Sequence, residues 1–85
     1  KRSALLGTIG VFDAETESAD DLKQIKGVGP QMEKTLNEIG IFTFAQVSRM
    51  TAREYDLLDE LTGSFPGRAQ RDDWAGQAKR LNEKN

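Results

Sequence analysis

Apolar side chains recur at intervals of three and four residues along most of this chain. Met32, Leu36 and Ile39 stand four and three positions apart, a spacing that places them on one face of an α-helix. The comparable apolar sets are Leu22 and Ile25; Phe44 and Val47; Tyr55, Leu58 and Leu61; and Trp74, Ala78 and Leu81. No strand-type alternation competes with this pattern. The sequence therefore predicts an all-α fold.

Capping signals divide these sets into five short helices. Gly40 and Gly63 follow the second and fourth sets, where a left-handed glycine ends a helix. Thr43 is a candidate N-cap for the third helix. Thr51 and Glu54 have the spacing of a capping box at the start of the fourth. We expect a flexible N-terminal segment to precede the five helices.

The predicted domain covers residues 20–82. Residues 1–19 are interpreted as a flexible tail and linker, because positions 13–19 are polar and acidic without an apolar period. Residues 83–85 are expected to be disordered. Residues 3–12 are uncharged, but they are shorter than the roughly 20 residues of a membrane-spanning helix, so we expect no membrane insertion of this fragment. Their apolar side chains have no obvious place in a five-helix core and are a candidate docking surface: Leu5, Leu6, Ile9, Val11 and Phe12.

The connection between the first two helices is the most informative motif. Gly27 and Gly29 permit backbone angles that a side chain disfavours, and Pro30 suits the first turn of a helix. The sequence predicts a tight hairpin between two helices. Its amides and the N-terminus of the second helix can form a small anion site.

The motif and its surroundings resemble the helix-hairpin-helix module appended to otherwise unrelated bacterial proteins. Those hosts include a peripheral subunit of NADH-quinone oxidoreductase and a large-subunit ribosomal protein. The resemblance is carried by Asp20-Asp21-Leu22-Lys23-Gln24-Ile25-Lys26-Gly27-Val28-Gly29-Pro30, Glu33 to Ile41, Thr43-Phe44, Phe65-Pro66-Gly67-Arg68 and Arg71-Asp72-Asp73-Trp74. It implies a fold and a docking role rather than a reaction. The order of the five helices further suggests two hairpin motifs, with a degenerate second one at Gly63 to Gly67.

Composition argues against an enzyme. The chain has no histidine and no cysteine, so the commonest general base, metal ligand and thiol nucleophile are absent. We expect a cytoplasmic, non-enzymatic protein with neither cofactor nor bound metal. The neighbouring carboxylates on predicted helices point about 100° apart and form no acid–base dyad: Asp20 and Asp21, Asp59 and Glu60, Asp72 and Asp73. The last pair suits the first turn of the fifth helix.

Charge decides between two candidate binding roles. Twelve basic and fourteen acidic residues give a net charge of −2, and no stretch has the basic character typical of nucleic-acid binding. The first choice is therefore a contact with a protein partner or host assembly. The alternative is weak, sequence-independent binding of a DNA or RNA backbone by the first hairpin. Gln31 stands where DNA-binding relatives usually place a basic residue, and Glu33 is expected beside any bound phosphate.

Each role has its own candidate residues. The candidates for phosphate binding are Lys26, Gly27, Val28, Gly29, Gln31 and Lys34. The candidates for partner binding are Phe65, Arg68 and Arg71. A structural interpretation stays open for every one of them, as a tight turn, a solvated helical face or local ion pairing. Trp74 is expected in the core because it lies on the apolar face of the last helix.

Overall fold

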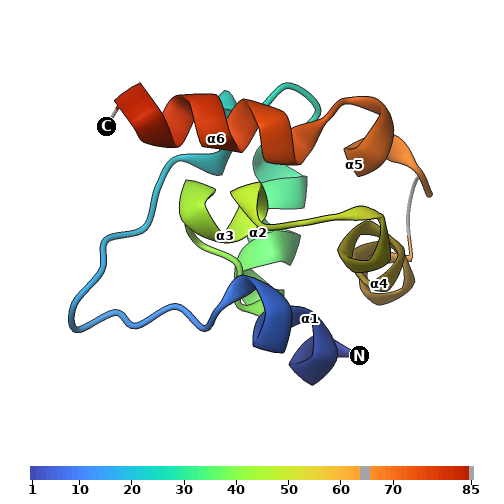
Figure 1. Cartoon of the computed structure of the whole chain (residues 1–85), viewed down its shortest axis with the longest axis horizontal. Helices are drawn as coiled ribbons and strands as arrows, with labels where there is room; N and C mark the ends of the chain where they lie inside the picture. Colours follow the sequence, from blue (N-terminus) through green and yellow to red (C-terminus); the bar gives the residue numbers. More distant parts are fainter. Residues whose placement is uncertain (64–65, 85) are drawn as a thin grey trace.

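The computed structural model describes residues 1–63 and 66–84, which are helical and contain no strand (Figure 1). Their helices are α1 (Arg2–Ile9), the 3₁₀ helix η1 (Leu22–Gln24), α2 (Pro30–Ile39), α3 (Phe44–Ser48), α4 (Ala52–Thr62), α5 (Arg68–Arg71) and α6 (Trp74–Lys84). The all-α prediction is confirmed. The predicted first helix is a single 3₁₀ turn, the predicted fifth helix corresponds to α6, and neither α1 nor α5 was expected.

The predicted capping residues fix the helix ends. The Thr43 hydroxyl accepts the Gln46 amide at the start of α3, and Thr51 and Glu54 form the expected capping box at the start of α4. Gly40 and Gly63 end α2 and α4 with φ values of 116° and 66°. Local capping chemistry thus sets these four boundaries as the sequence indicated.

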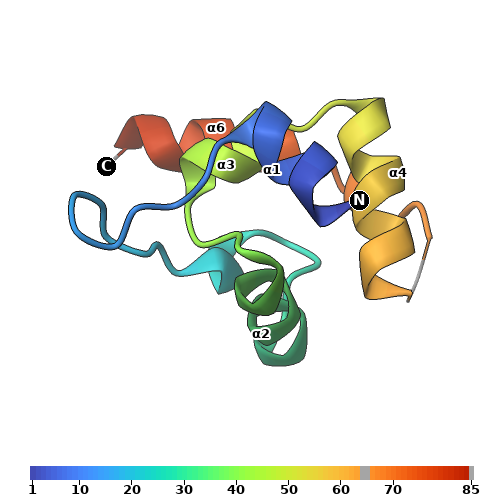
Figure 2. The ribbon, with the colours of Figure 1, turned by 90° about the horizontal axis from the view of Figure 1, so that it is seen from below.

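Helices α3 and α6 pack against each other through the centre of the molecule, and α2 extends away from that pair (Figure 2). Trp74 and Phe44 are the largest fully buried side chains and occupy this centre. Trp74 is therefore a core residue, as predicted. The surrounding buried apolar side chains are Leu5, Leu6, Ile9, Leu22, Ile25, Val28, Leu36, Ile39, Ile41, Val47, Met50, Tyr55, Leu58, Ala69 and Ala78.

The N-terminal segment differs from the prediction. Residues 2–9 form α1, which lies against α4 and α3 (Figure 2), and Leu5 and Ile9 are both 0% exposed. The interpretation of this stretch as an unpacked tail and docking surface was wrong, because its apolar side chains complete the core. Beyond α1, the Phe12 ring packs on Phe42 with 4.6 Å between centroids, whereas Val11 is 74% exposed.

Asp73 separates the unexpected short helix α5 from α6, which corresponds to the predicted fifth helix. Its φ of 50° interrupts the helical backbone between α5 and α6. Its carboxylate then accepts the Gly76 amide at 3.1 Å, and its carbonyl accepts the Gln77 amide at 3.0 Å. Asp72 ends α5 rather than lying in the first turn of a helix. At the other end, α6 runs through Lys84, so residues 83–84 are helical rather than disordered.

Candidate functional site

The hairpin between η1 and α2 is a tight turn. Its first backbone bond joins the Val28 amide to the Ile25 carbonyl at 3.0 Å. Gly27 adopts φ 102°, in the left-handed region that favours glycine. Gly29 adopts an extended backbone, with φ −95° and ψ −176°, which other residues also adopt. The predicted turn is present, but only Gly27 of the two glycines needs its conformational freedom.

Gly27 also allows the hairpin to approach the junction of α5 and α6. A Cβ atom built on Gly27 would lie 2.5 Å from Asp72 Oδ2 and 2.8 Å from Trp74 Nε1. The Trp74 Nε1 atom is buried and has no hydrogen-bond partner among the described residues. The backbone of Gly27 therefore fills the space beside this indole. The Val28 side chain is buried, as is usual for a side chain that lies between two helices.

Gln77 of α6 holds the backbone of the hairpin in place. Its side-chain Oε1 accepts the Lys26 amide at 2.8 Å, and its Nε2 donates to the Lys26 carbonyl at 3.2 Å and to the Asp72 carbonyl at 2.7 Å. The role of Gln77 was not predicted from the sequence. Fifty-one positions separate Gln77 from Lys26. No sequence pattern indicates that a single glutamine on a helix makes such a distant contact.

A groove of about 260 Å³ lies beside the turn. Its walls are formed by Gly27, Gly29, Pro30, Gln31, Met32, Thr35 and Arg68. The amides of Gln31 and Met32 precede the first hydrogen bond of α2, which the Glu33 amide donates to the Gly29 carbonyl at 2.9 Å. The groove thus combines the N-terminus of α2 with one arginine from α5.

The charged candidates separate into different places. Lys26 and Lys34 are exposed, and neither lines the groove. Arg68 does line it, whereas Arg71 lies beside Asp72 with 3.8 Å between Nε and Oδ1. Phe65 lies outside the described residues. The structure therefore brings Gly27, Gly29, Gln31 and Arg68 together around the groove and leaves both lysines outside it.

The Glu33 carboxylate lies toward η1, which corrects the expectation that it would stand beside a phosphate. Its Oε2 accepts the Leu22 amide at 3.0 Å, and its Oε1 lies 3.5 Å from Lys23 Nζ. Asp21 caps the same turn by accepting the Lys23 amide at 3.2 Å. The hydrogen bond from the Lys23 ammonium lowers the pKa of Asp21. These contacts direct both carboxylates toward η1 and not into the groove.

The remaining carboxylate pairs also have structural roles. Asp20 Oδ2 accepts the Phe44 amide at 2.8 Å, which caps α3, and Asp59 Oδ2 accepts the Gly67 amide at 2.9 Å. Within residues 1–63 and 66–84, no three carboxylates gather as metal ligands. No helix in the same ranges is long and apolar enough to cross a membrane.

The chain is similar to ribosomal proteins of both subunits. It is 46% identical over 81 residues to large ribosomal subunit protein bL21 of Roseobacter denitrificans, covering 95% of this chain and 37% of that protein. It is 44% identical over 63 residues to small ribosomal subunit protein uS2 of Xanthobacter autotrophicus, covering 74% of this chain and 18% of the relative. The chain spans less than two fifths of the length of either relative.

A third relative is an uncharacterized 22.9 kDa protein in the nqo2 3′ region of Paracoccus denitrificans. It is 41% identical over 63 residues, covering 74% of this chain and 29% of that protein. No solved structure matches the chain. The family described as the RS2/RL21/YNQ2 HHH domain matches residues 22–82, which include the hairpin, the groove and the central pair of α3 and α6. The chain therefore belongs to this helix-hairpin-helix family.

Proposed function

We propose that this chain is a non-enzymatic accessory module that docks a larger cytoplasmic protein onto a protein partner through the hairpin groove. The observation that carries the proposal is the composition of the groove. Its walls are glycine backbone, Pro30, Met32 and two uncharged polar side chains, with Arg68 as the one charged residue. Arginine beside apolar surface is characteristic of protein interfaces. Lys26 and Lys34, whose positive charges would attract a phosphate, lie outside the groove.

The relatives support an accessory role. The same module matches a large-subunit protein, a small-subunit protein and a protein of the nqo2 3′ region, and it covers only a minor part of each. A module shared by proteins with such different names is better explained by a common attachment function than by a common reaction.

Contact with an RNA backbone is the second candidate. It is favoured by the backbone amides at the N-terminus of α2. It is also favoured by the direction of the Glu33 carboxylate, which accepts the Leu22 amide and so lies away from those amides. Helix N-termini are suitable sites for phosphate groups, and relatives named as ribosomal proteins make RNA the relevant nucleic acid.

A position-specific photocrosslink separates the two candidates. Benzoylphenylalanine replaces Gln31 in the full-length host protein, and in a matched control it replaces Lys79, an exposed residue of α6. We expect a protein adduct from position 31 that is absent from position 79 and lost with Arg68→Ala. An RNA adduct at position 31 would instead favour the second candidate. No adduct at position 31 would contradict both.

Salt dependence tests the RNA candidate independently. The chain is titrated with duplex and single-stranded RNA at low and moderate salt while its amide NMR shifts are followed. Phosphate binding predicts shifts centred on residues 27–31, a steep loss of affinity with salt, and loss of binding in Lys26→Glu and Lys34→Glu. Under the first proposal, the shifts stay small at near-physiological salt.

A further inference from the structure

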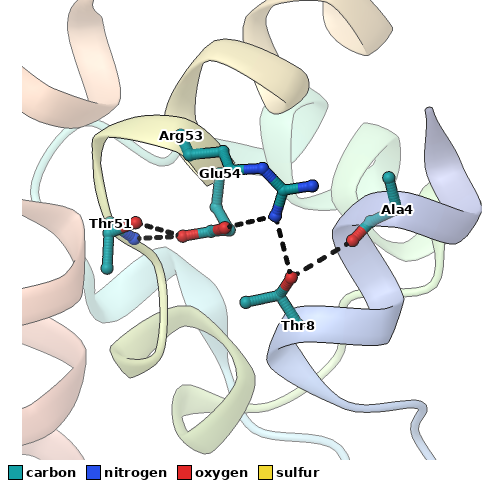
Figure 3. Close-up of polar contacts among 5 residues, drawn as sticks. All are labelled: Ala4, Thr8, Thr51, Arg53 and Glu54. Carbon is teal, nitrogen blue, oxygen red and sulfur yellow. Dashed lines mark hydrogen bonds and ion pairs between the residues drawn. The ribbon is translucent and has the colours of Figure 1, made fainter.

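Most cationic side chains of this chain have a structural partner. Arg53 Nη1, for example, lies 3.3 Å from both Thr8 Oγ1 and an oxygen of the buried Glu54 carboxylate, and so links α4 to α1 (Figure 3). The cations that interact with other groups of the chain are Lys1, Arg2, Lys23, Arg49, Arg53, Arg68 and Arg71. These seven are explained by the fold itself.

The other five cations have neither an ion pair nor a side-chain hydrogen bond within residues 1–63 and 66–84. They are Lys26, Lys34, Lys79, Arg80 and Lys84. Three of them lie on α6, and the backbone of Lys26 is bound to α6 by Gln77. Glu83 is the one carboxylate of α6. In a chain with a net charge of −2, the unpaired positive charge is therefore concentrated on α6 and the hairpin that it holds.

Two of these cations line a groove between η1 and α6, which we call the α6 groove. Its volume is about 210 Å³. It is lined by Gln24, Gln77, Arg80, Leu81 and Lys84. Arg80 and Lys84 are four positions apart, so their side chains are neighbours on one face of the helix. None of these residues lines the hairpin groove, so the two grooves are separate sites.

The side chains of the α6 groove suit a peptide that carries carboxylates. Arg80 and Lys84 are exposed and can each form a charge-assisted hydrogen bond with a carboxylate. Leu81 lies between them in the sequence and is half-buried, so it offers an apolar contact. The Gln24 amide is exposed and can bind a peptide backbone. These groups match an apolar side chain flanked by acidic ones.

The same observations argue against a nucleic acid in this groove. Its lining contains no aromatic side chain on which a base could stack. The unpaired positive charge is confined to one helix and the adjoining hairpin, whereas the chain as a whole is acidic. A long polyanion would extend from α6 onto that acidic surface and be repelled there. A short acidic peptide would contact the cations alone.

We propose that the α6 groove binds a short acidic segment of a protein partner. Its carboxylates pair with Arg80 and Lys84, and an apolar side chain between them packs on Leu81. This second contact goes beyond the docking role of the hairpin groove and shares no residue with it. Because exposed charges contribute more to association rate and specificity than to affinity, the contact is weak and sensitive to salt.

A peptide titration of the whole chain tests the proposal. The probe is acetyl-Glu-Glu-Leu-Glu-Glu-amide, and its uncharged counterpart has glutamine in place of each glutamate. We expect saturable amide NMR shifts at Gln24, Lys26 and residues 77–84 with the acidic peptide, and none with the uncharged one. Moderate salt should weaken the binding. Glycine in place of the central leucine should raise Kd about 3-fold, because the contact with Leu81 is lost.

Single charge removals locate the binding site. Arg80→Gln and Lys84→Gln should each raise Kd about 3-fold, and the double variant about 10-fold. Lys34→Gln is the matched control, because Lys34 is equally exposed and unpaired but lies on α2. It should change Kd by less than about 2-fold. All four positions of change are exposed or solvent-facing, so the amide spectra of the free variants should remain those of the folded protein.

Four results would overturn the proposal. An unchanged Kd in the double variant would exclude the groove, and an equal effect of Lys34→Gln would show attraction to net charge alone. A uridine oligonucleotide of equal charge that binds the same residues more tightly would make RNA the ligand. Shifts in α6 that grow with protein concentration in the absence of peptide would make a second copy, through its acidic residues 13–17, the occupant.

Discussion

The two ends of α2 are built in different ways. At its N-terminus, the turn of the hairpin is closed by a hydrogen bond between sequence neighbours, Ile25 and Val28, although Gln77 also holds its backbone from 51 positions away. At its C-terminus, α1 is held by hydrogen bonds between residues 36, 37 and 40 positions apart. Turn chemistry is local and can be recognised in a sequence, whereas the docking of a separate helix depends on the whole fold.

The largest effect is expected at the α1 end. Leu5→Ala removes a fully buried side chain and should lower the free energy of unfolding by about 2–5 kcal/mol. Urea denaturation measures the loss. Val11→Ala is the control and should change stability by less than about 0.5 kcal/mol. A Leu5→Ala protein as stable as the native one would show that α1 contributes little to the core.

Two glutamines provide a matched pair. Gln46→Ala, at the α1 end, leaves the partly buried carbonyls of Gly10 and Gly40 without their donor and should cost about 1–3 kcal/mol. Gln77→Ala, at the hairpin end, should cost less than about 1 kcal/mol, because Gln77 is partly exposed and water can replace it. Thermal denaturation of both variants checks the order. Equal losses would remove the proposed difference between the two ends.

The two glycines of the hairpin sharpen the comparison at its N-terminal end. Gly27→Ala forces a left-handed backbone and a contact with the Trp74 ring, and should cost at least about 1–2 kcal/mol. Gly29→Ala should be close to neutral, since its backbone is extended and no atom lies within 4 Å of an added Cβ. The melting temperatures of the two variants test this difference in stability. The hairpin geometry is wrong if Gly29→Ala is the more damaging change.

The smallest effect concerns pH. The pKa of Glu54 is lowered below its ordinary value of 4.5 by the Thr51 hydroxyl. Its contribution to stability is therefore complete above about pH 4.5 and is lost as the pH falls through the lower pKa of the folded state. We expect the difference in unfolding free energy between the native protein and Glu54→Gln to be constant from pH 7 to 5 and to shrink below 4.5. A difference that grows on acidification would contradict the assignment.

Particular residues show what the sequence could reveal. Gly27, Pro30, Thr43 and Thr51 were assigned correctly because their backbone roles depend on near neighbours. The placement of α1 was not predicted. Three apolar residues after Lys1 and Arg2 give only a weak helical signal, and the sequence does not show which part of the fold they contact.

The sequence assigned the residues of the candidate surface to two separate roles, Gly29 and Gln31 to phosphate binding and Arg68 to partner binding. Gly29, Gln31 and Arg68 do meet at one groove. The position of Lys26 and Lys34 outside it, and the direction of the Glu33 carboxylate toward Leu22, depend on contacts across the fold. A sequence can name the charged residues near a motif, but it cannot say which way each side chain points.

The position of Trp74 has a spectroscopic consequence. It is the only tryptophan in the chain, and its indole nitrogen is buried beside Gly27 without a hydrogen-bond partner among the described residues. Its fluorescence therefore originates from a buried site next to the hairpin, so a ligand that shifts this turn should change the emission maximum without any added dye. A ligand that binds away from the hairpin should leave the emission almost unchanged, and one fluorescence measurement can tell the two kinds of binding apart.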